Sequence, residues 1–219
     1  MPRLGKITFV ILIVLAIVGF FYLLDEGSDI VNPNYITISY IAPLPYGSIK
    51  AEINANFLTD IQEKYNEFKS KVPFIESEVP ENSEFLVRYT ITAPEKYEET
   101  SIAVDSSGLL QDIELRDGGG NILSKDENNR FIFQNDLYQF DDTNLIVTGK
   151  TKSLGSNSYS GENLKLVLFS KNEPVFESEL QTIKICKKNV PDGCSDKLKQ
   201  FSLLLQEVIK KNVTTEESH

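Results

Sequence analysis

The N-terminal part of the chain contains one uninterrupted apolar run. Residues 7–24 read ITFVILIVLAIVGFFYLL and carry no charged side chain. As an α-helix, a run of this length would extend roughly 27 Å, close to the ~30 Å of hydrocarbon in a bilayer. Its apolar residues surround the helix on all sides instead of forming one stripe, unlike an amphipathic helix of a water-soluble protein. The run therefore predicts a transmembrane helix.

A cleaved signal peptide is the alternative interpretation of residues 7–24. Such a peptide has an apolar region of only about 7–15 residues, followed by a cleavage site with small side chains. Here the run continues directly into Asp25 and Glu26, so carboxylates stand where a small residue would be needed. We therefore expect the segment to be retained as a signal anchor that holds the protein in the lipid bilayer.

The charges around the run predict its orientation. Arg3 and Lys6 precede it, whereas Asp25 follows it. The positive-inside rule then places residues 1–6 in the cytoplasm. We expect a single-pass protein of the cell membrane, with residues 25–219 forming an extracytoplasmic domain.

This expected outer part of the chain is acidic. All 32 acidic residues but only 20 of the 22 basic residues follow position 24. A negative field repels nucleic-acid phosphates, so we expect no nucleic-acid partner. The 195 residues after the run are enough to bury a substantial core, in one large domain or in two small ones.

The two cysteines, Cys186 and Cys194, enclose the segment KKNVPDG. Its Pro-Asp-Gly sequence favours a turn that would bring the two sulfur atoms together, so we predict a disulfide bond. An oxidising compartment outside the cell membrane would agree with this pairing. Free thiols and a metal site remain the alternatives, although seven intervening residues do not match the usual zinc spacings and no histidine lies nearby.

The segment after the apolar run changes in pattern along its length. Residues 25–47 predict a short juxtamembrane linker, EGSDIVNPN, and then a strand, YITISYIAP, with alternating side chains. Residues 48–84 predict a helical segment, in which Phe57 to Lys71 show the clearest helical spacing and Pro73 would end the helix. The preceding IKAEINAN also alternates as a strand would, so its conformation stays open. The apolar positions that define this helical face are Ile49, Ile53, Phe57, Ile61, Tyr65, Phe68 and Val72.

Residues 85–194 predict an antiparallel β-sandwich domain. Eight short segments with period-two alternation are separated by turn-forming clusters such as DGGGN and GSNSYSGEN. The last two segments are joined only by KNE, which predicts a hairpin. The expected strands cover residues 85–93, 100–104, 109–116, 121–124, 130–134, 144–153, 163–170 and 174–185.

Residues 195–212 predict a C-terminal amphipathic helix that Ser195 would cap. Its apolar stripe is too large to remain in water, so it must dock on the protein's own sandwich, on a partner or on a second copy. Docking on its own sandwich is the expected outcome, and residues 213–219 predict a disordered tail. The stripe consists of Leu198, Phe201, Leu205 and Val208.

The segment of residues 144–180 resembles small immunoglobulin-like modules of microbial surface proteins, of the CARDB and FxLYD kind. Val147 and Gly149 match the end of their first strand, and Leu164, Leu166 and Leu168 match the next one. The sequence departs from the pattern at Ser153, where these modules often have Asn, and at Asn172-Glu173, where they often have Asp-Gly. The resemblance implies an Ig-like sandwich used in adhesion or assembly.

No arrangement of catalytic residues is apparent. The single histidine, His219, is the final residue of a polar tail, so serine or cysteine catalysis has no candidate base. Asp117, Asp136, Asp141 and Asp142 are candidates for two-carboxylate chemistry, but their Gly- and Asn-rich surroundings favour solvated turns. We assign no catalytic residue, no metal ligand and no cofactor.

These observations predict a mainly β protein with an N-terminal transmembrane helix, an extracytoplasmic antiparallel sandwich, a helix before it and an amphipathic helix after it. Two functions remain open. One is a membrane-anchored binding or structural module of the cell envelope, which would contact an envelope protein or associate with itself through protein–protein contacts. The other is an extracytoplasmic carboxylate-dependent enzyme acting on an envelope polymer.

Overall fold

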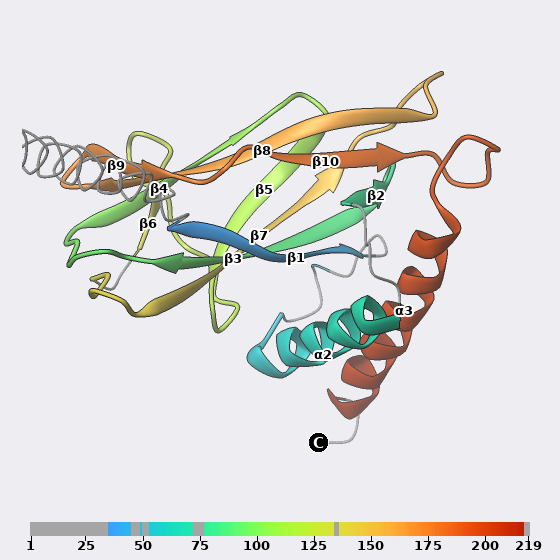
Figure 1. Ribbon diagram of the computed structural model, residues 1–219, viewed down its shortest axis with the longest axis horizontal. Helices are drawn as coiled ribbons and strands as arrows, with labels where there is room; N and C mark the ends of the chain where they lie inside the picture. Colours follow the sequence, from blue (N-terminus) through green and yellow to red (C-terminus); the bar gives the residue numbers. More distant parts are fainter. Residues whose placement is uncertain (1–34, 45–48, 50–52, 72–76, 134–135, 217–219) are drawn as a thin grey trace, which may run out of the picture. The chain divides into compact units, whose positions relative to one another are not determined.

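The computed structural model describes residues 35–44, 49, 53–71, 77–133 and 136–216, with side chains up to residue 210. This part of the chain is mainly β, with two sheets in which antiparallel pairing predominates (Figure 1). Within these ranges no helix is long and apolar enough to cross a membrane. The predicted transmembrane helix at residues 7–24 lies outside them, as do the predicted cytoplasmic residues 1–6, the linker that precedes position 35 and the last three residues of the predicted tail.

The first sheet has four antiparallel strands in the order β1, β3, β7, β5. β1 joins the sheet by pairing with β3, from Ile36 opposite Ile91 to Leu44 opposite Glu84. It therefore belongs to the β domain that we expected to begin at residue 85. The strands are β1 (Ile36–Leu44), β3 (Glu84–Thr92), β7 (Asp142–Thr151) and β5 (Leu110–Asp117).

The second sheet has six strands. Its order is β2, β10, β8, β4, β6, and β9 pairs with β8 next to β10. The pairing of β2 with β10 is parallel, and the other pairs are antiparallel. The strands are β2 (Glu78–Pro80), β4 (Thr100–Ser106), β6 (Phe131–Ile132), β8 (Tyr159–Ser170), β9 (Glu173–Glu177) and β10 (Gln181–Cys186).

Both sheets contribute to one large apolar cluster. Val87 and Val147 come from the four-stranded sheet, Leu166 and Ile185 come from the six-stranded sheet, and all four are fully buried. A Cβ atom at Gly149 of β7 would lie 2.7 Å from Ile113 Cδ1 and 2.9 Å from Phe85 Cζ, so a larger residue here would require these two side chains to shift.

Two helices, α2 (Ala55–Lys71) and α3 (Asp196–Glu216), form a second apolar cluster with the four-stranded sheet. Both lie beside that sheet in Figure 1, and α3 also packs on α2. α2 begins after Asn54, whose Oδ1 accepts a hydrogen bond from the Phe57 N–H at 2.9 Å. The cluster contains Tyr40, Ala42, Leu44, Ile53, Phe57, Leu58, Ile61, Phe68, Leu86, Ile146, Phe201, Leu205 and Val208.

The C-terminal stripe therefore docks on the protein's own chain, as expected. Phe201 and Leu205 are completely buried, and the Phe201 ring lies 5.3 Å from that of Phe68 and 6.1 Å from that of Tyr65, measured between ring centroids. The helix extends beyond the predicted boundary at residue 212. It continues to Glu216, because no glycine or proline in this part of the sequence stops it.

The strands differ from the predictions in several places. β8 begins at Tyr159, inside the segment GSNSYSGEN that was expected to form a turn, because residues 159–164 pair with β10. Within the predicted helical segment 48–84, the three-residue strand β2 follows α2, and a strand this short carries no recognisable period. The predicted strand 121–124 forms only an isolated bridge, between Arg116 and Ile122. The predicted strand 174–185 is divided into β9 and β10, although both pieces pair with β8 as the expected hairpin requires.

Candidate functional site

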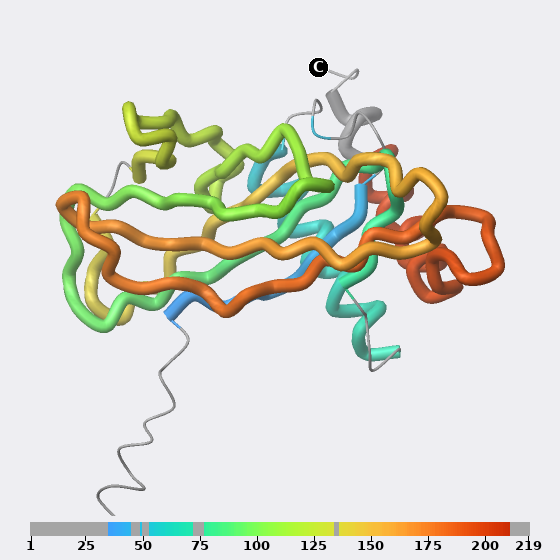
Figure 2. Tube along the Cα trace, turned by 90° about the horizontal axis from the view of Figure 1, so that it is seen from above, coloured from blue at the N-terminus to red at the C-terminus, as the bar shows by residue number. Residues whose placement is uncertain are grey.

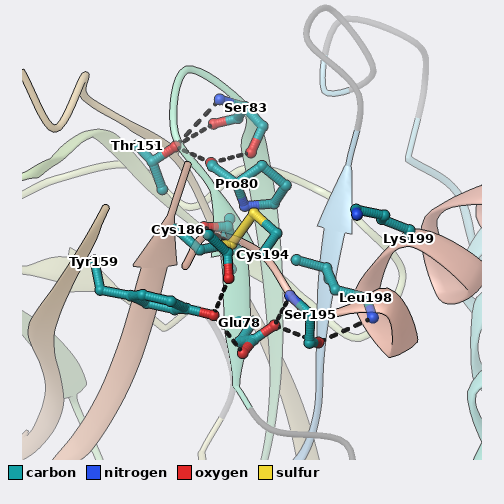
Figure 3. The surroundings of a disulfide bond; sticks show 12 residues. Glu78, Pro80, Ser83, Thr151, Tyr159, Cys186, Cys194, Ser195, Leu198 and Lys199 are labelled. Carbon is teal, nitrogen blue, oxygen red and sulfur yellow. Dashed lines mark hydrogen bonds between the residues drawn. A yellow bond between two sulfur atoms is a disulfide. The ribbon is translucent and has the colours of Figure 1, made fainter. Parts of the chain in front are cut away.

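Cys186 and Cys194 form a disulfide bond, which confirms the predicted pairing (Figure 3). Cys186 is the last residue of β10, and the loop returns to it because the Cys194 N–H donates to the Lys187 carbonyl oxygen at 2.9 Å. A Cβ atom at Gly193 would lie 2.1 Å from that same carbonyl oxygen. The turn therefore requires glycine at this position.

A buried carboxylate, Glu78 of β2, joins this loop to the rest of the domain. Glu78 Oε2 accepts hydrogen bonds from the Ser195 N–H at 3.0 Å and from the Ser195 hydroxyl at 2.6 Å. The Tyr159 hydroxyl of β8 lies 3.1 Å from Glu78 Oε1 (Figure 3). The same hydroxyl also contacts the Gly193 carbonyl oxygen. One side chain thus links β2, β8 and the residue before α3.

The start of α3 depends on the same carboxylate. Ser195 Oγ accepts a hydrogen bond from the Leu198 N–H at 3.3 Å, which is the capping role predicted for Ser195. Glu78 places a negative charge at the positive end of the helix dipole. Helix α3 therefore begins at a position fixed by the disulfide on one side and by Glu78 on the other.

The turn between β2 and β3 is fixed by the hydroxyl of Thr151 in β7. Thr151 Oγ1 donates to the Pro80 carbonyl oxygen at 2.7 Å and accepts from the Ser83 N–H at 3.1 Å (Figure 3). The Ser83 hydroxyl donates to the same Pro80 carbonyl. All three residues are buried at this edge of the domain.

A pocket of about 280 Å³ lies between these fixed parts. Its lining is mainly apolar and includes Leu44 at the end of β1, Pro80, Cys194 and Leu198. Leu203 on α3 also lines the pocket. It is 62% exposed, whereas the four residues of the apolar stripe on this helix are buried. The pocket therefore has an apolar floor and an exposed apolar side chain at its margin.

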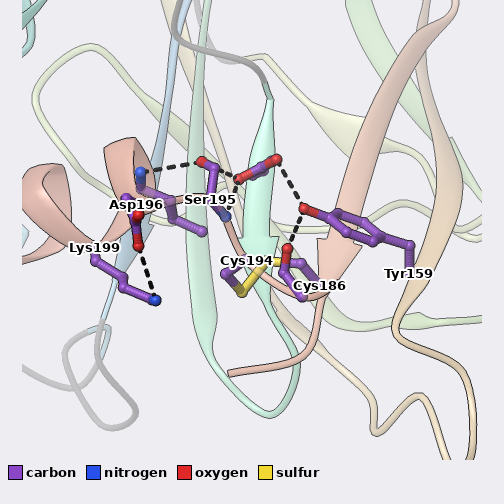
Figure 4. A network of polar contacts seen from close by, with 9 residues as sticks. Tyr159, Cys186, Cys194, Ser195, Asp196 and Lys199 are labelled. Carbon is purple, nitrogen blue, oxygen red and sulfur yellow. Dashed lines mark hydrogen bonds and ion pairs between the residues drawn. A yellow bond between two sulfur atoms is a disulfide. The ribbon is translucent and has the colours of Figure 1, made fainter. Parts of the chain in front are cut away.

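Two lysines, Lys188 and Lys199, also line this pocket. Lys199 Nζ forms an ion pair with Asp196 Oδ1 at 3.0 Å (Figure 4). Lys188 belongs to the disulfide loop and is exposed. The margin of the pocket is therefore more basic than the strongly acidic chain as a whole.

The candidate carboxylates of the sequence lie in local turns. Asp117 Oδ1 accepts from the backbone N–H groups of Gly119 and Asn121, both at 2.9 Å, and thereby organises its own turn. Asp136 forms an ion pair with Lys96 at 3.1 Å. Asp117 therefore stabilises its own turn, as its Gly- and Asn-rich surroundings favoured, whereas Asp136 joins two separate segments through an ion pair.

The remaining two candidates, Asp141 and Asp142, belong to the turn before β7 and to its first residue. Asp142 Oδ1 accepts a hydrogen bond from the Thr92 hydroxyl at 2.6 Å, across the β3–β7 pair. Among the described residues, no three histidine, cysteine or carboxylate side chains are grouped so that they could hold a metal ion.

Comparisons with known proteins give no family. No protein-family model matches the chain, and no curated protein sequence matches it. Two solved structures are distantly similar. One is a family 123 glycoside hydrolase from Clostridium perfringens, with 7% identity and a TM-score of 0.28 over 69% of this chain and 27% of that one.

The other is the CsuC–CsuE chaperone–tip adhesion subunit complex of the Csu pili of Acinetobacter baumannii, with 12% identity and a TM-score of 0.25. It covers 57% of this chain and 60% of that one. The chain thus spans about a quarter of the length of the first structure and three fifths of the second. At these TM-scores neither structure indicates a function.

Glu78, Tyr159 and the pocket were not predicted from the sequence. Glu78 lies 81 residues from Tyr159 and 117 residues from Ser195, so no local spacing connects them. The only local signal was Ser195 as a helix cap. Leu203 stands beside the predicted stripe of α3, and its exposure could be recognised only once the helix was placed.

Proposed function

We propose that this protein is a membrane-anchored binding and structural module of the cell envelope, built on an Ig-like β-sandwich. Residues 7–24 anchor it with the N-terminus in the cytoplasm, and the domain that follows lies outside. The uncharged run and the charges on its two sides support this topology. The Cys186–Cys194 disulfide is consistent with an oxidising compartment.

The exposure of Leu203 beside the pocket is the observation that best supports a binding function. Leu203 is 62% exposed and lines an apolar pocket, on a helix whose other described large apolar side chains are buried or partly buried. Apolar groups that flank a preformed hollow are typical of surfaces that bind another protein. We infer that an apolar side chain of a partner fills the pocket and covers Leu203.

The size and charge of the pocket define the partner further. Its volume of about 280 Å³ is at the lower end of the ~300–1,000 Å³ typical of small-molecule sites, and suits one or two side chains. Lys188 and Lys199 at its margin favour an acidic residue next to that apolar group. The partner is therefore an envelope protein that presents an apolar side chain beside a carboxylate.

Site-specific photo-crosslinking in intact cells tests this binding site. A photoreactive amino acid replaces Leu203 in the full chain, and in a matched control it replaces Leu180, which is 59% exposed and does not line the pocket. We expect a discrete protein adduct from position 203 alone, with an apolar and acidic cross-linked peptide. Equal adducts at both positions, or no adduct at position 203, would contradict the proposal.

The anchoring is tested separately by alkaline extraction of membranes. We expect the chain to remain with the lipid, because a transmembrane helix is not released by carbonate, and we expect added protease to degrade residues after position 25 on intact spheroplasts. Release into the supernatant, or protection of the C-terminal part, would refute the proposed topology.

A further inference from the structure

The loop that precedes β7 presents two large apolar side chains to solvent. Phe140 is 72% exposed and Tyr138 is 55% exposed. Phe140 has a φ of 61°, in a region that residues other than glycine rarely occupy. Two hydrogen bonds keep the loop in place, from the Phe140 N–H to the Ala93 carbonyl at 2.8 Å and from Gln139 Nε2 to the Pro94 carbonyl at 2.8 Å. The fold therefore holds an exposed aromatic pair in a defined conformation.

This loop lies at the end of the sheet where β1 begins. The Thr92 N–H at the end of β3 donates to the Tyr35 carbonyl at 2.8 Å, and the next residue, Ala93, is the one that holds Phe140. Because β3 lies between β1 and β7, Tyr35 and the start of β7 are about 10 Å apart, which is two strand spacings. Figures 1 and 2 both show the start of β1 and this loop, which is gold, at the same end of the domain.

The chain upstream of Tyr35 limits how far this end can be from a membrane. This step rests on the proposed function, in which residues 7–24 span the bilayer. Residues 25–34 then connect the lipid to Tyr35, and ten residues reach at most about 36 Å when fully extended. The start of β1 therefore lies within about 36 Å of the bilayer surface, and the aromatic pair, two strands away in the same sheet, remains within reach of that surface.

We propose that Tyr138 and Phe140 insert into the outer interface of the lipid bilayer and fix the orientation of the domain on it. Tyrosine rings are enriched at this depth because one end is apolar and the other is polar. Lys96 Nζ lies 5.7 Å from the centroid of the Tyr138 ring, where its charge can remain at the level of the headgroups. The pair thus has the chemistry of an interfacial anchor.

The charges of this end determine which lipids it contacts. Asp136, Asp141 and Asp142 lie within the same loop and strand start, and Glu98 pairs with Lys96. These carboxylates repel anionic headgroups, so the loop favours a zwitterionic surface. Two aromatic side chains bind a membrane only weakly by themselves, but the short tether raises their effective concentration at the surface.

Tryptophan fluorescence tests the proposal, because the natural chain contains no tryptophan. The Phe140→Trp variant of the full chain is reconstituted into phosphatidylcholine vesicles. A matched Leu203→Trp variant places the probe at another well-exposed position, which lies beside Leu44 at the far end of β1, roughly 30 Å along the strand. Brominated phosphatidylcholine then serves as the quencher.

We expect brominated lipid to reduce the emission of the Phe140→Trp variant at least twofold and to leave that of the Leu203→Trp variant nearly unchanged. Adding Tyr138→Ser should weaken the quenching. Flotation of the vesicles tests the membrane anchoring separately from the insertion of the aromatic pair. A chain that floats with the vesicles but shows equal quenching, or none, at both positions overturns this inference alone. A chain that does not float overturns the anchoring and this inference together.

Discussion

The hydroxyl of Ser195 donates a hydrogen bond to Glu78 Oε2 at 2.6 Å, across 117 residues of sequence. Glu78 belongs to β2, the three-residue strand at one edge of the six-stranded sheet, whereas Ser195 directly precedes helix α3. The contact therefore connects the six-stranded sheet to the helix that covers the other sheet. It has measurable consequences for stability.

Replacing Glu78 should weaken the whole domain. Glu78→Ala removes an acceptor that serves the Ser195 N–H and hydroxyl, and hydrogen bonds to a charged group contribute about 1.5–3 kcal/mol. We expect the free energy of unfolding, measured by urea denaturation of the domain formed by residues 35–219, to fall by about 2–3 kcal/mol. The exposed Glu127→Ala is the control and should change it by less than about 0.5 kcal/mol. Equal effects of the two substitutions would show that Glu78 has no structural role.

Removing the disulfide should lower stability without abolishing the fold. Closing a loop of about nine residues contributes roughly 2.5 kcal/mol on the chain-entropy model, and the two apolar clusters remain intact in its absence. The Cys186→Ser, Cys194→Ser double variant should therefore unfold at lower urea concentration in one cooperative transition. Wild-type protein whose disulfide has been opened by a reducing agent should show the same shift. A double variant that is already unfolded without urea would contradict the expectation.

The two faces of α3 should respond differently to the same truncation. Phe201→Ala creates a cavity at a fully buried position between α2, α3 and the sheet, and should cost about 3–5 kcal/mol. Leu203→Ala removes an exposed side chain of the same helix and should cost less than about 0.5 kcal/mol. Thermal unfolding of the two variants measures the difference. Similar losses would mean that the helix is not docked as described.

Alkaline pH should destabilise the domain through Tyr40. Burial raises the pKa of this phenol to about 12, and the nearby Arg88 guanidinium opposes the shift only in part. The phenol must remain neutral in the folded protein but ionises more readily in the unfolded chain. Its contribution is therefore fully present below pH 10 and is lost as the pH rises from about 10 to about 12.

Tyr40→Phe isolates this effect. The variant should lose less stability than wild type between pH 9 and 12, by roughly 2 kcal/mol at the upper end, when unfolding is followed by circular dichroism. The comparison removes the contributions of the other tyrosines, which both proteins share. Parallel curves for the two proteins would exclude Tyr40 as the source of alkaline sensitivity.

The sequence predicted those parts of the fold that have a local cause. Alternation identified β3, β5, β7 and β8, the four-residue spacing identified α2, and the turn chemistry of KKNVPDG identified the disulfide. The capping role of Ser195 was predicted for the same reason, because a cap acts within its own helix. These features need only neighbouring residues, so a single sequence contains enough information.

The features that could not be predicted from the sequence depend on contacts between residues far apart in the chain. β2 is a strand because β10 pairs with it in parallel, and its three residues have no pattern of their own. Nothing near Glu78 in the sequence distinguishes it from a surface carboxylate, because its hydrogen-bond partners come from β8 and from the residue before α3. The pocket likewise arises where β1, the disulfide loop and α3 meet, and only the folded chain brings those segments together.

The position of α3 in the chain has a consequence for biosynthesis. Tyr40, Leu86 and Ile146 on the outer face of the four-stranded sheet are buried under helices, and α3 follows every strand in the sequence. A nascent polypeptide therefore completes this sheet before α3, one of the two helices that cover it, has emerged. Products that stop short of residue 196 carry a partly uncovered apolar face, which makes them natural substrates for chaperones and quality-control proteases.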